Sequence, residues 1–262
     1  MIALVTGASA GIGRDMAIYL SSIGYDLIIT ARDTLKLREL KSELRTRVKI
    51  ITADLSKPEN AEKLYNCCKK YNIDFLVNNA GIGVVGKFDE TSLEKETDLI
   101  NLNVLSMHIL MKLFLKDFKE RNSGRILNVA SSAGFFPGPL MAAYYASKNY
   151  VVNLSQSVRR ELKEDGSAVS ISVLCPGPVR TQFNIRAGVT NSFSQADSEE
   201  VAVYAIKKAL KNYFYIVPTL KMKFAVYGAM IAPPELKSGI VYKIQKKKLQ
   251  TDNSFIKKIN NL

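Results

Sequence analysis

A tyrosine and a lysine lie four residues apart in the segment 142–162, which lacks glycine and proline and carries apolar residues at helical spacing. Residues four apart on a helix project from the same face, so the ammonium group of Lys148 can lie beside the phenol of Tyr144. A neighbouring positive charge favours the phenolate and lowers a pKa that is ordinarily about 10. Such a tyrosine can donate and accept a proton near neutral pH. The pair alone is weak evidence, because any helix can hold it by chance.

Two adjacent serines precede this helix, at the end of a predicted strand. Residues 125–130 form a short apolar run typical of a buried strand, and Ser131 and Ser132 follow it directly. The apolar loop 135–141 then leads to the helix, and its side chains either form the wall of a pocket or pack on the core. The groups that can do chemistry therefore come from a strand end and from the next helix.

A glycine-rich turn follows an apolar strand at residues 1–6 and precedes an amphipathic helix that reaches about residue 23. The order strand, glycine turn, helix is typical of a dinucleotide site, because glycines let backbone N–H groups approach a pyrophosphate at the positive end of the helix. The glycines are Gly7, Gly11 and Gly13, with the spacing Gly-x-x-x-Gly-x-Gly. The usual fingerprint is Gly-x-Gly-x-x-Gly.

The end of the second predicted strand, 26–30, indicates which dinucleotide is bound. The residue at this position faces the adenosine ribose, where an acid binds the 2′-hydroxyl and a base accommodates a 2′-phosphate. Ala31 leaves the position empty and Arg32 follows it, which favours NADPH; a solvent-facing Arg32 without a ligand is the alternative. Asp33 lies about 20 residues past the glycines, as in NAD sites, but is better placed to cap the helix 34–44.

Polar residues also follow the predicted strands 48–52 and 73–77. Asp54 either hydrogen-bonds the adenine or caps the helix that starts near Pro58. The amides of Asn78 and Asn79 can join neighbouring strands, while small residues after them let the backbone pass close to a ligand. Asn103 lies inside a predicted helix that starts near residue 93, where asparagine does not favour stability; it is either functional or a surface residue.

These motifs follow one another in the order known from one family: Thr6-Gly7-x-x-x-Gly11-x-Gly13, Asn78-Asn79-Ala80-Gly81, Asn103-x-x-Ser106, Ser131, Tyr144-x-x-x-Lys148 and Pro176-Gly177-Pro178-Val179-x-Thr181. The chain resembles the short-chain dehydrogenase/reductase family over nearly its whole length, in the branch of general carbonyl, ketoacyl and hydroxysteroid reductases. The resemblance implies one α/β domain over residues 1–235. Its fold would be a Rossmann-type, doubly wound, mainly parallel sheet with helices on both faces, followed by a basic C-terminal tail at 236–262.

The resemblance also implies a catalytic tetrad of Asn103, Ser131, Tyr144 and Lys148. Ser131 is the family's serine because it stands three residues before Gly134 and thirteen before Tyr144. In the family's mechanism hydride passes from the nicotinamide to a carbonyl carbon, the tyrosine is the general acid or base, and the serine orients the oxygen. The lysine lowers the tyrosine pKa and binds the nicotinamide ribose, and the asparagine holds a water molecule.

The implied cofactor is NADP(H), and no metal is expected. The residues expected to bind the cofactor are Gly7, Ser9, Gly11, Ile12, Gly13, Arg32, Asp54, Leu55, Asn79, Ala80, Gly81, Tyr144, Lys148, Pro176, Gly177, Val179 and Thr181. The substrate would be a small molecule with a carbonyl or an alcohol. Segment 182–196 corresponds to the family's variable substrate lid, and its Phe183 and Ile185 would add to an apolar pocket wall.

The net charge of +13 is concentrated near the C-terminus, where residues 236–262 contain seven lysines and one aspartate. The body is only moderately basic, so we expect no nucleic-acid partner. Leu236, Ile240 and Ile244 recur every fourth residue among the lysines, which allows peripheral contact with anionic lipid; a solvated, frayed tail is the preferred interpretation. The C-terminal sequence departs from the family's commonest ending, which leaves a homodimer and a homotetramer both open.

The N-terminal apolar residues lack the basic flank of a signal peptide, and no stretch approaches the ~20 apolar residues of a membrane span. We therefore expect a cytoplasmic protein. An NADPH-dependent oxidoreductase is the leading hypothesis. The alternatives are a non-catalytic, dinucleotide-binding redox sensor and a protein whose main role is at the membrane periphery.

Overall fold

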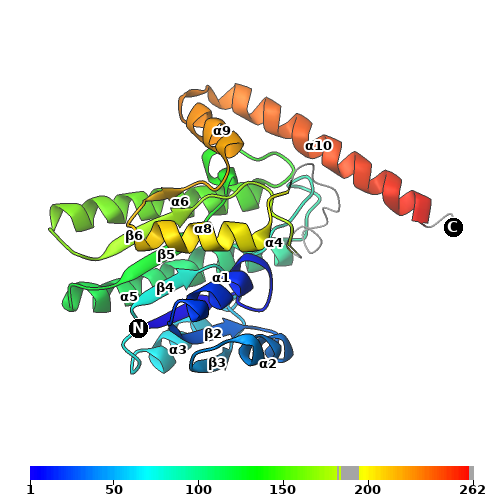
Figure 1. Ribbon diagram of the computed structural model, residues 1–262. Coiled ribbons are helices and arrows are strands. Elements are labelled where there is room, and N and C mark those ends of the chain that lie inside the picture. The colour runs from blue at the N-terminus through cyan, green and yellow to red at the C-terminus, as the bar shows by residue number, and fades with distance from the viewer. Residues whose placement is uncertain (182, 184–194, 260–262) are drawn as a thin grey trace.

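The computed structural model describes the backbone of residues 1–181, 183 and 195–259, with side chains as far as residue 249. Seven strands of this part of the chain form one parallel sheet in the order β3-β2-β1-β4-β5-β6-β7 (Figure 1). The order reverses between β1 and β4, which creates the crevice where α/β sheets bind ligands. The strands are β1 Ile2–Thr6, β2 Asp26–Ala31, β3 Val48–Thr52, β4 Phe75–Asn78, β5 Arg125–Val129, β6 Ser170–Leu174 and β7 Tyr215–Ile216.

Helices cover both faces of the sheet, as the sequence predicts. Helices α1, α2 and α8 pack in the core on one face, and α3, α5 and α6 pack in the core on the other. The described helices are α1 Gly11–Ser22, α2 Thr34–Glu43, α3 Glu59–Cys68, α4 Leu93–Ile100, α5 Met107–Glu120, α6 Ala142–Glu164, α8 Ser198–Leu210, α9 Leu220–Ile231 and α10 Pro234–Ile259. The prediction of a doubly wound, Rossmann-type fold is confirmed.

Strand β1 shows why the central strands are largely apolar. Ala3 and Val5 are buried in the core on one face, whereas Leu4 is buried in the core on the other. Successive side chains of a strand point to opposite faces, so a strand covered by helices on both faces is apolar at most positions. The apolar runs of the sequence therefore mark the strands of a buried parallel sheet.

The run Leu93–Glu120 is long and apolar enough to cross a membrane by length and composition, which differs from the expectation that no stretch is. In the fold it comprises α4, a π-helical turn at Asn101–Ser106, and α5. Its side chains Met111, Phe114 and Phe118 are buried in the core on one face of the sheet. These side chains make α5 a core helix, whereas Leu93, Ile100 and Leu105 earlier in the run are exposed.

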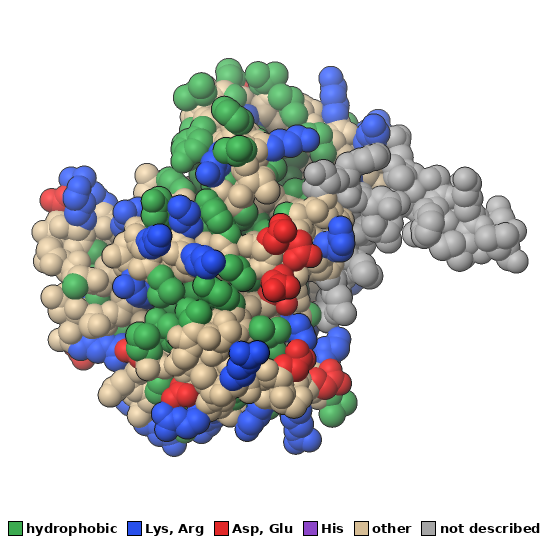
Figure 2. Space-filling model, in the orientation of Figure 1, with side chains coloured by type: hydrophobic (Ala, Val, Ile, Leu, Met, Phe, Trp, Pro, Cys, Tyr) green, Lys and Arg blue, Asp and Glu red, His purple; other side chains and the backbone are tan. Residues whose placement is uncertain are grey.

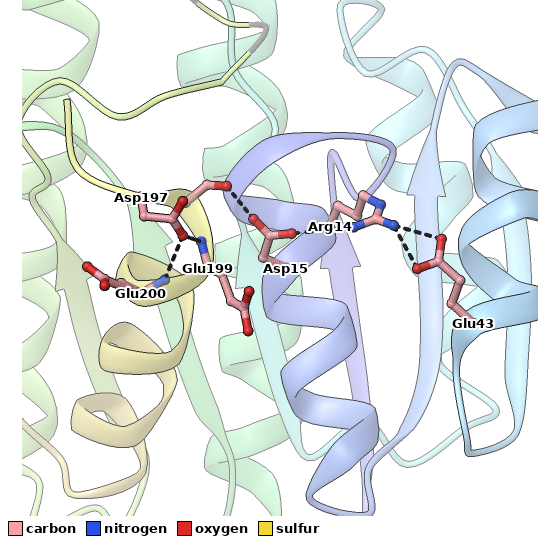
Figure 3. Close-up of polar contacts among 7 residues, drawn as sticks. Arg14, Asp15, Glu43, Asp197, Glu199 and Glu200 are labelled. Atoms are coloured by element: carbon pink, nitrogen blue, oxygen red, sulfur yellow. Dashed lines mark hydrogen bonds and ion pairs between the residues drawn. The ribbon is translucent and has the colours of Figure 1, made fainter.

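Helix α1 starts directly after the glycine-rich turn and is held by polar contacts on two sides (Figure 3). Arg14 donates two hydrogen bonds of 2.7 Å to the carboxylate of Glu43 on α2. On the other side, Ser198 Oγ in the first turn of α8 donates to Asp15 at 2.5 Å. Asp197 accepts hydrogen bonds from two backbone N–H groups and caps α8. These contacts tie α1 to α2 and to α8.

The C-terminal lysine-rich segment is a helix, not the frayed tail that was preferred from the sequence. Helix α10 begins at Pro234, so the expected boundary at 235/236 falls within its first turn. Val241 and Gln245 on this helix are buried. The frayed-tail interpretation is therefore wrong for the first part of 236–262, because two of its side chains pack against the body. Figure 1 shows α9 and α10 together at the top of the molecule.

Candidate active site

The predicted site residues surround one cavity of about 750 Å³ at the carboxyl ends of the central strands. It is lined at one end by the glycine-rich turn and Arg32, and at the other by Ser131, Tyr144 and Lys148. Asn103 and Gly13 are the two predicted residues that do not line it. The others that do are Ser9, Gly7, Gly11, Ile12, Asp54, Leu55, Asn79, Ala80, Gly81, Pro176, Gly177, Val179 and Thr181.

Ser131 directs its hydroxyl group toward the cavity from the end of β5. It is the N-cap of the short 3₁₀ helix Ser132–Phe135, and its Oγ accepts a hydrogen bond of 3.1 Å from the backbone N–H of Ala133. A hydrogen bond also links its side chain to Tyr144. The strand end and α6 therefore bring these two hydroxyl groups together, as the spacing in the sequence predicts.

The electrostatics of Tyr144 differ from the expectation. Burial raises the pKa of Tyr144 to about 12, while the hydrogen bond with Ser131 acts in the opposite direction. The ammonium nitrogen of Lys148 lies 5.8 Å from the centroid of the tyrosine ring. The expected lowering of the tyrosine pKa by lysine is thus absent, because desolvation of the phenolate outweighs the more distant charge.

Lys148 is buried, and its ammonium group donates a 2.9 Å hydrogen bond to the backbone carbonyl of Val129. Its side chain is thus drawn toward the end of β5. Burial lowers the pKa of Lys148 to about 8, because the charged form loses hydration. The ammonium form still predominates at pH 7, and the site keeps one buried positive charge near the phenol.

Asn103 is buried in the π-helical turn between α4 and α5, so the surface alternative is wrong. Its Nδ2 donates to the carbonyl of Ile82 at 2.9 Å and to Ser147 Oγ at 3.1 Å. Its Oδ1 accepts from the backbone N–H of Ile82 at 2.9 Å. The side chain therefore joins the loop after Gly81 to α6. A π-helical turn often marks a functional position in a helix.

The two asparagines at the end of β4 join neighbouring strands, as predicted. Asn78 donates to Asn128 Oδ1 on β5 at 3.0 Å, and Asn79 Nδ2 donates to the carbonyl oxygens of Thr6 and Gly7 at 2.9 and 3.2 Å. A Cβ atom on Gly13 would lie 2.1 Å from Asn79 Nδ2. Gly13 thus contributes by leaving room for the asparagine that holds the glycine-rich turn.

At the other end of the cavity, Arg32 is exposed and makes no hydrogen bond or ion pair within the described part of the chain. Asp33 caps α2 by accepting from the N–H of Lys36 at 3.1 Å, as predicted. Asp54 accepts from the N–H and the hydroxyl of Ser56, both at 3.0 Å. Because α3 begins later, at Glu59, without a side-chain cap, the helix-capping explanation for Asp54 is wrong.

The expected apolar wall is only partly present. Met141 and Phe183 line the cavity, and the ring of Phe183 lies 5.5 Å from the ring of Tyr144. Phe135 packs instead against Tyr215, with 5.7 Å between ring centroids. Ile185 and most of the expected lid 182–196 lie outside the described residues.

Residues from elsewhere in the chain, which the motifs in the sequence do not indicate, also line the cavity. Gln245 of α10 lines it and donates a 2.8 Å hydrogen bond to the hydroxyl of Tyr145, and Lys248 lines it one turn further along the helix. Lys95 and Asp98 of α4 also contribute. Val241 and Gln245 lie four residues apart and share one side of the helix, but the sequence does not indicate which surface this side covers.

The fold and the cavity define a dinucleotide-binding α/β protein, and comparisons with known proteins establish the family. The family model described as short chain dehydrogenase matches residues 1–191. The chain therefore belongs to the short-chain dehydrogenase/reductase family of oxidoreductases, whose members bind a nicotinamide dinucleotide.

Relatives and solved structures extend this result. The chain is 31% identical over 182 residues to an uncharacterized oxidoreductase of Staphylococcus epidermidis. The matched region covers 69% of this chain and 78% of that protein. It is 34% identical over 174 residues to a very-long-chain 3-oxoacyl-CoA reductase of Phaeosphaeria nodorum, of which it spans 51%, with 63% of this chain covered.

Two solved structures show different cofactors in the same fold. A short-chain dehydrogenase from Sphingobium yanoikuyae in complex with NADPH superposes with a TM-score of 0.80 at 29% identity, covering 87% of this chain and 92% of that one. A family member from Burkholderia phymatum in complex with NAD superposes with a TM-score of 0.79 at 25% identity, covering 86% and 91%.

Proposed function

We propose that this protein is an NADPH-dependent oxidoreductase that interconverts a carbonyl and an alcohol on an apolar small molecule. The convergence of Ser131, Tyr144 and Lys148 at one end of a cavity that has a glycine-rich turn at its other end carries this proposal. A cavity of about 750 Å³ is in the range of sites that hold a cofactor and a small substrate.

The glycine-rich turn fits a dinucleotide. Gly7 and Gly11 have φ angles of +67° and +55°, a region that disfavours residues with a Cβ. A Cβ on Gly7 would lie 2.9 Å from the backbone of Ala80. The backbone can therefore approach a pyrophosphate closely at the N-terminus of α1, where the helix dipole favours negative charge.

Arg32 supports NADPH over NADH. Its guanidinium group is exposed at the cavity beside the end of β2 and has no ion-pair partner within the described residues. The carboxylate of Asp33 accepts a hydrogen bond from the first turn of α2, so it is engaged by the backbone. The guanidinium of Arg32 can therefore bind a 2′-phosphate on the ribose, whereas the carboxylate of Asp33 is already hydrogen-bonded to the backbone. This combination favours NADPH.

When bound, NADPH supplies the hydride for reduction of the carbonyl carbon. Tyr144 donates the proton that the carbonyl oxygen takes up, and Ser131 hydrogen-bonds the same oxygen and offsets its developing charge. The raised pKa of Tyr144 keeps the phenol protonated at neutral pH, which is the form a proton donor requires. Lys148, whose ammonium nitrogen lies 5.8 Å from the centroid of the Tyr144 ring, would bind the nicotinamide ribose.

The apolar side chains of Met141 and Phe183 support a substrate with a substantial apolar part. The names of the fungal relatives, very-long-chain 3-oxoacyl-CoA reductases, support the reduction of a ketone on such a substrate. Because this chain spans about half of those proteins, their substrate is one class among those to be tested.

The proposal is tested by following NADPH oxidation with 3-oxoacyl thioesters, ketosteroids, diketones and aldehydes. For any substrate that turns over, we expect Tyr144→Phe to reduce kcat by about 10² to 10⁴-fold, the usual range for a general acid. NADPH affinity should stay within about threefold, because the substitution removes a hydroxyl group and leaves the cavity intact.

Tyr150→Phe is the matched control, because Tyr150 lies on the same helix and its hydroxyl contacts His108 outside the cavity. Equal activity of Tyr144→Phe and the wild type would refute the proposed role. Tight NADPH binding without turnover of any substrate class would instead favour the redox-sensor alternative.

A further inference from the structure

Helix α9 leaves a stripe of large apolar side chains in solvent. Phe224 and Ile231 are 79% and 88% exposed. Leu220, which precedes them, and Tyr227, which lies between them, are also exposed. These residues follow one another at intervals of four, three and four, so they lie on one face of the helix. The opposite face is already occupied, because Val226 and Ala229 are buried and Met222 packs against Gly177.

Helix α10 extends this apolar surface. Leu236, Ile240 and Ile244 are exposed at intervals of four, while Val241 and Gln245 on another side of the helix are buried. Figure 2 shows hydrophobic side chains gathered over this end of the molecule, with Lys and Arg side chains beside them. We call the exposed surface of residues 220–249 the α9–α10 surface.

The charge on this surface has one sign. Residues 220–249 contain seven lysines, of which Lys221, Lys243, Lys246 and Lys247 are exposed, and a single acidic residue, Glu235. On α9, Lys221 and Lys223 flank the apolar stripe on its two sides, since they lie one residue after Leu220 and one before Phe224. Long lysine side chains beside an apolar stripe can reach outward while the apolar groups enter a nonpolar phase.

From this arrangement we infer that the α9–α10 surface docks on an anionic lipid membrane, with the apolar stripe in the acyl boundary and the lysines at the phosphate groups. Apolar side chains flanked by lysines are the composition that binds at such an interface. Each lysine near an anionic surface strengthens binding about fivefold.

Charge complementarity favours lipid over a second copy of this chain. In a two-fold symmetric dimer the same patch meets itself, so the lysines of one copy would face those of the other. Like charges brought together in this way weaken association. An anionic bilayer matches both the apolar stripe and the charge.

Docking through this surface would bring the candidate active site beside the lipid. Helix α10 carries the apolar surface on one side and lines the cavity through Gln245 and Lys248 on another. An apolar substrate dissolved in the membrane would then reach the cavity directly. This consequence rests on the proposed function, whereas the docking itself does not.

The test is co-sedimentation of the full chain with vesicles of phosphatidylcholine alone and of phosphatidylcholine mixed with phosphatidylglycerol. We expect binding to the mixed vesicles that weakens with added salt. The double substitution Phe224→Ser, Ile231→Ser should weaken it at least about tenfold, because two apolar groups no longer enter the bilayer. Lys221→Glu with Lys243→Glu should weaken it by about tenfold or more.

Matched controls come from equally exposed residues elsewhere. Leu35→Ser with Phe88→Ser replaces side chains that are 69% and 70% exposed, and Lys112→Glu with Lys116→Glu changes exposed lysines on α5. Both controls should bind like the wild type. The inference is overturned by equal sedimentation with the two vesicle types, or by equal effects of the control and test substitutions. The inference is also overturned if the protein does not bind vesicles but forms a dimer that the double substitution Phe224→Ser, Ile231→Ser dissociates. That result would favour self-association.

Discussion

The side-chain amide of Gln245 on α10 donates a 2.8 Å hydrogen bond to the hydroxyl of Tyr145, the residue next to Tyr144. The glutamine is buried, and the bond is partly buried at the wall of the cavity. The C-terminal helix is therefore fastened to the start of α6, the helix that carries the proposed proton donor.

We expect the side chains of Gln245 and Tyr145 to stabilise the protein together, through this one hydrogen bond. Gln245→Met and Tyr145→Phe should each lower the free energy of unfolding by about 1 kcal/mol, the usual contribution of one hydrogen bond. The double variant should lose little more than either single variant, with a coupling of about 1 kcal/mol. Urea unfolding of the four proteins measures this coupling. Strictly additive losses would show that the two side chains do not interact in solution.

Much of the fold follows from local patterns in the sequence. Apolar strands alternating with amphipathic helices predict a parallel sheet, and strand ends marked by Gly7, Asn79 and Ser131 predict where a ligand binds. The carboxyl ends of parallel strands meet at one edge, so residues far apart in the chain converge once the sheet is correct. The predicted cofactor and catalytic residues therefore line one cavity, with two exceptions.

The features that were missed depend on packing. Gln245 lies 100 residues from its partner Tyr145, and no periodicity indicates which surface α10 covers. The pKa of Tyr144 depends on burial, which the spacing of Tyr144 and Lys148 does not report. Asn103 lies in a π-helical turn, whose hydrogen bonding leaves no clear pattern in the sequence. The contact of Gln245, the pKa of Tyr144 and the turn around Asn103 all depend on the three-dimensional packing of the chain.

The buried lysine predicts a specific pH dependence of stability. The pKa of Lys148 falls from 10.5 to about 8 on folding, so between these values the unfolded chain binds more protons than the native protein. Stability therefore rises with pH across this window. Relative to Lys148→Met, the wild type should gain about 3 kcal/mol between pH 8 and pH 10.5.

Urea unfolding at several pH values checks this, and taking the difference between the two proteins cancels the titration of other groups. Lys112→Met, at an exposed position, is the control and should show no such trend. A difference that stays constant from pH 8 to pH 10.5 would mean that Lys148 titrates normally in the folded protein.

The glycine-rich turn predicts a steric effect at Gly13. An added Cβ would lie 2.1 Å from Asn79 Nδ2 and 2.6 Å from the carbonyl oxygen of Gly7, so the turn must shift. Gly13→Ala should lower the free energy of unfolding by about 1 to 3 kcal/mol, as for overpacked cores. Dinucleotide binding should weaken as well, because Asn79 holds the turn in place.

Gly228→Ala is the matched control for Gly13→Ala, since Gly228 lies in α9 and, apart from the nearby backbone of its own helix, no atom lies within 4 Å of the added Cβ. That substitution should stabilise the protein by about 0.5 to 1 kcal/mol, because alanine favours a helix. Thermal unfolding and dinucleotide titration measure both effects. Wild-type stability of Gly13→Ala would show that the turn tolerates a side chain.

The choice of cofactor predicts a selective effect at Arg32. Arg32→Ala should weaken NADPH binding by about 10- to 100-fold, because a hydrogen-bonded contact with a charged group contributes about 1.5 to 3 kcal/mol. NADH binding should change by no more than about twofold, since NADH lacks the 2′-phosphate.

Arg38→Ala is the control, because Arg38 is an exposed arginine of α2 that does not line the cavity. It should leave both affinities unchanged. Fluorescence titration with each dinucleotide gives the four dissociation constants and their ratios. Equal losses for NADPH and NADH would place Arg32 away from the phosphate, and the cofactor preference would then have to come from another part of the site.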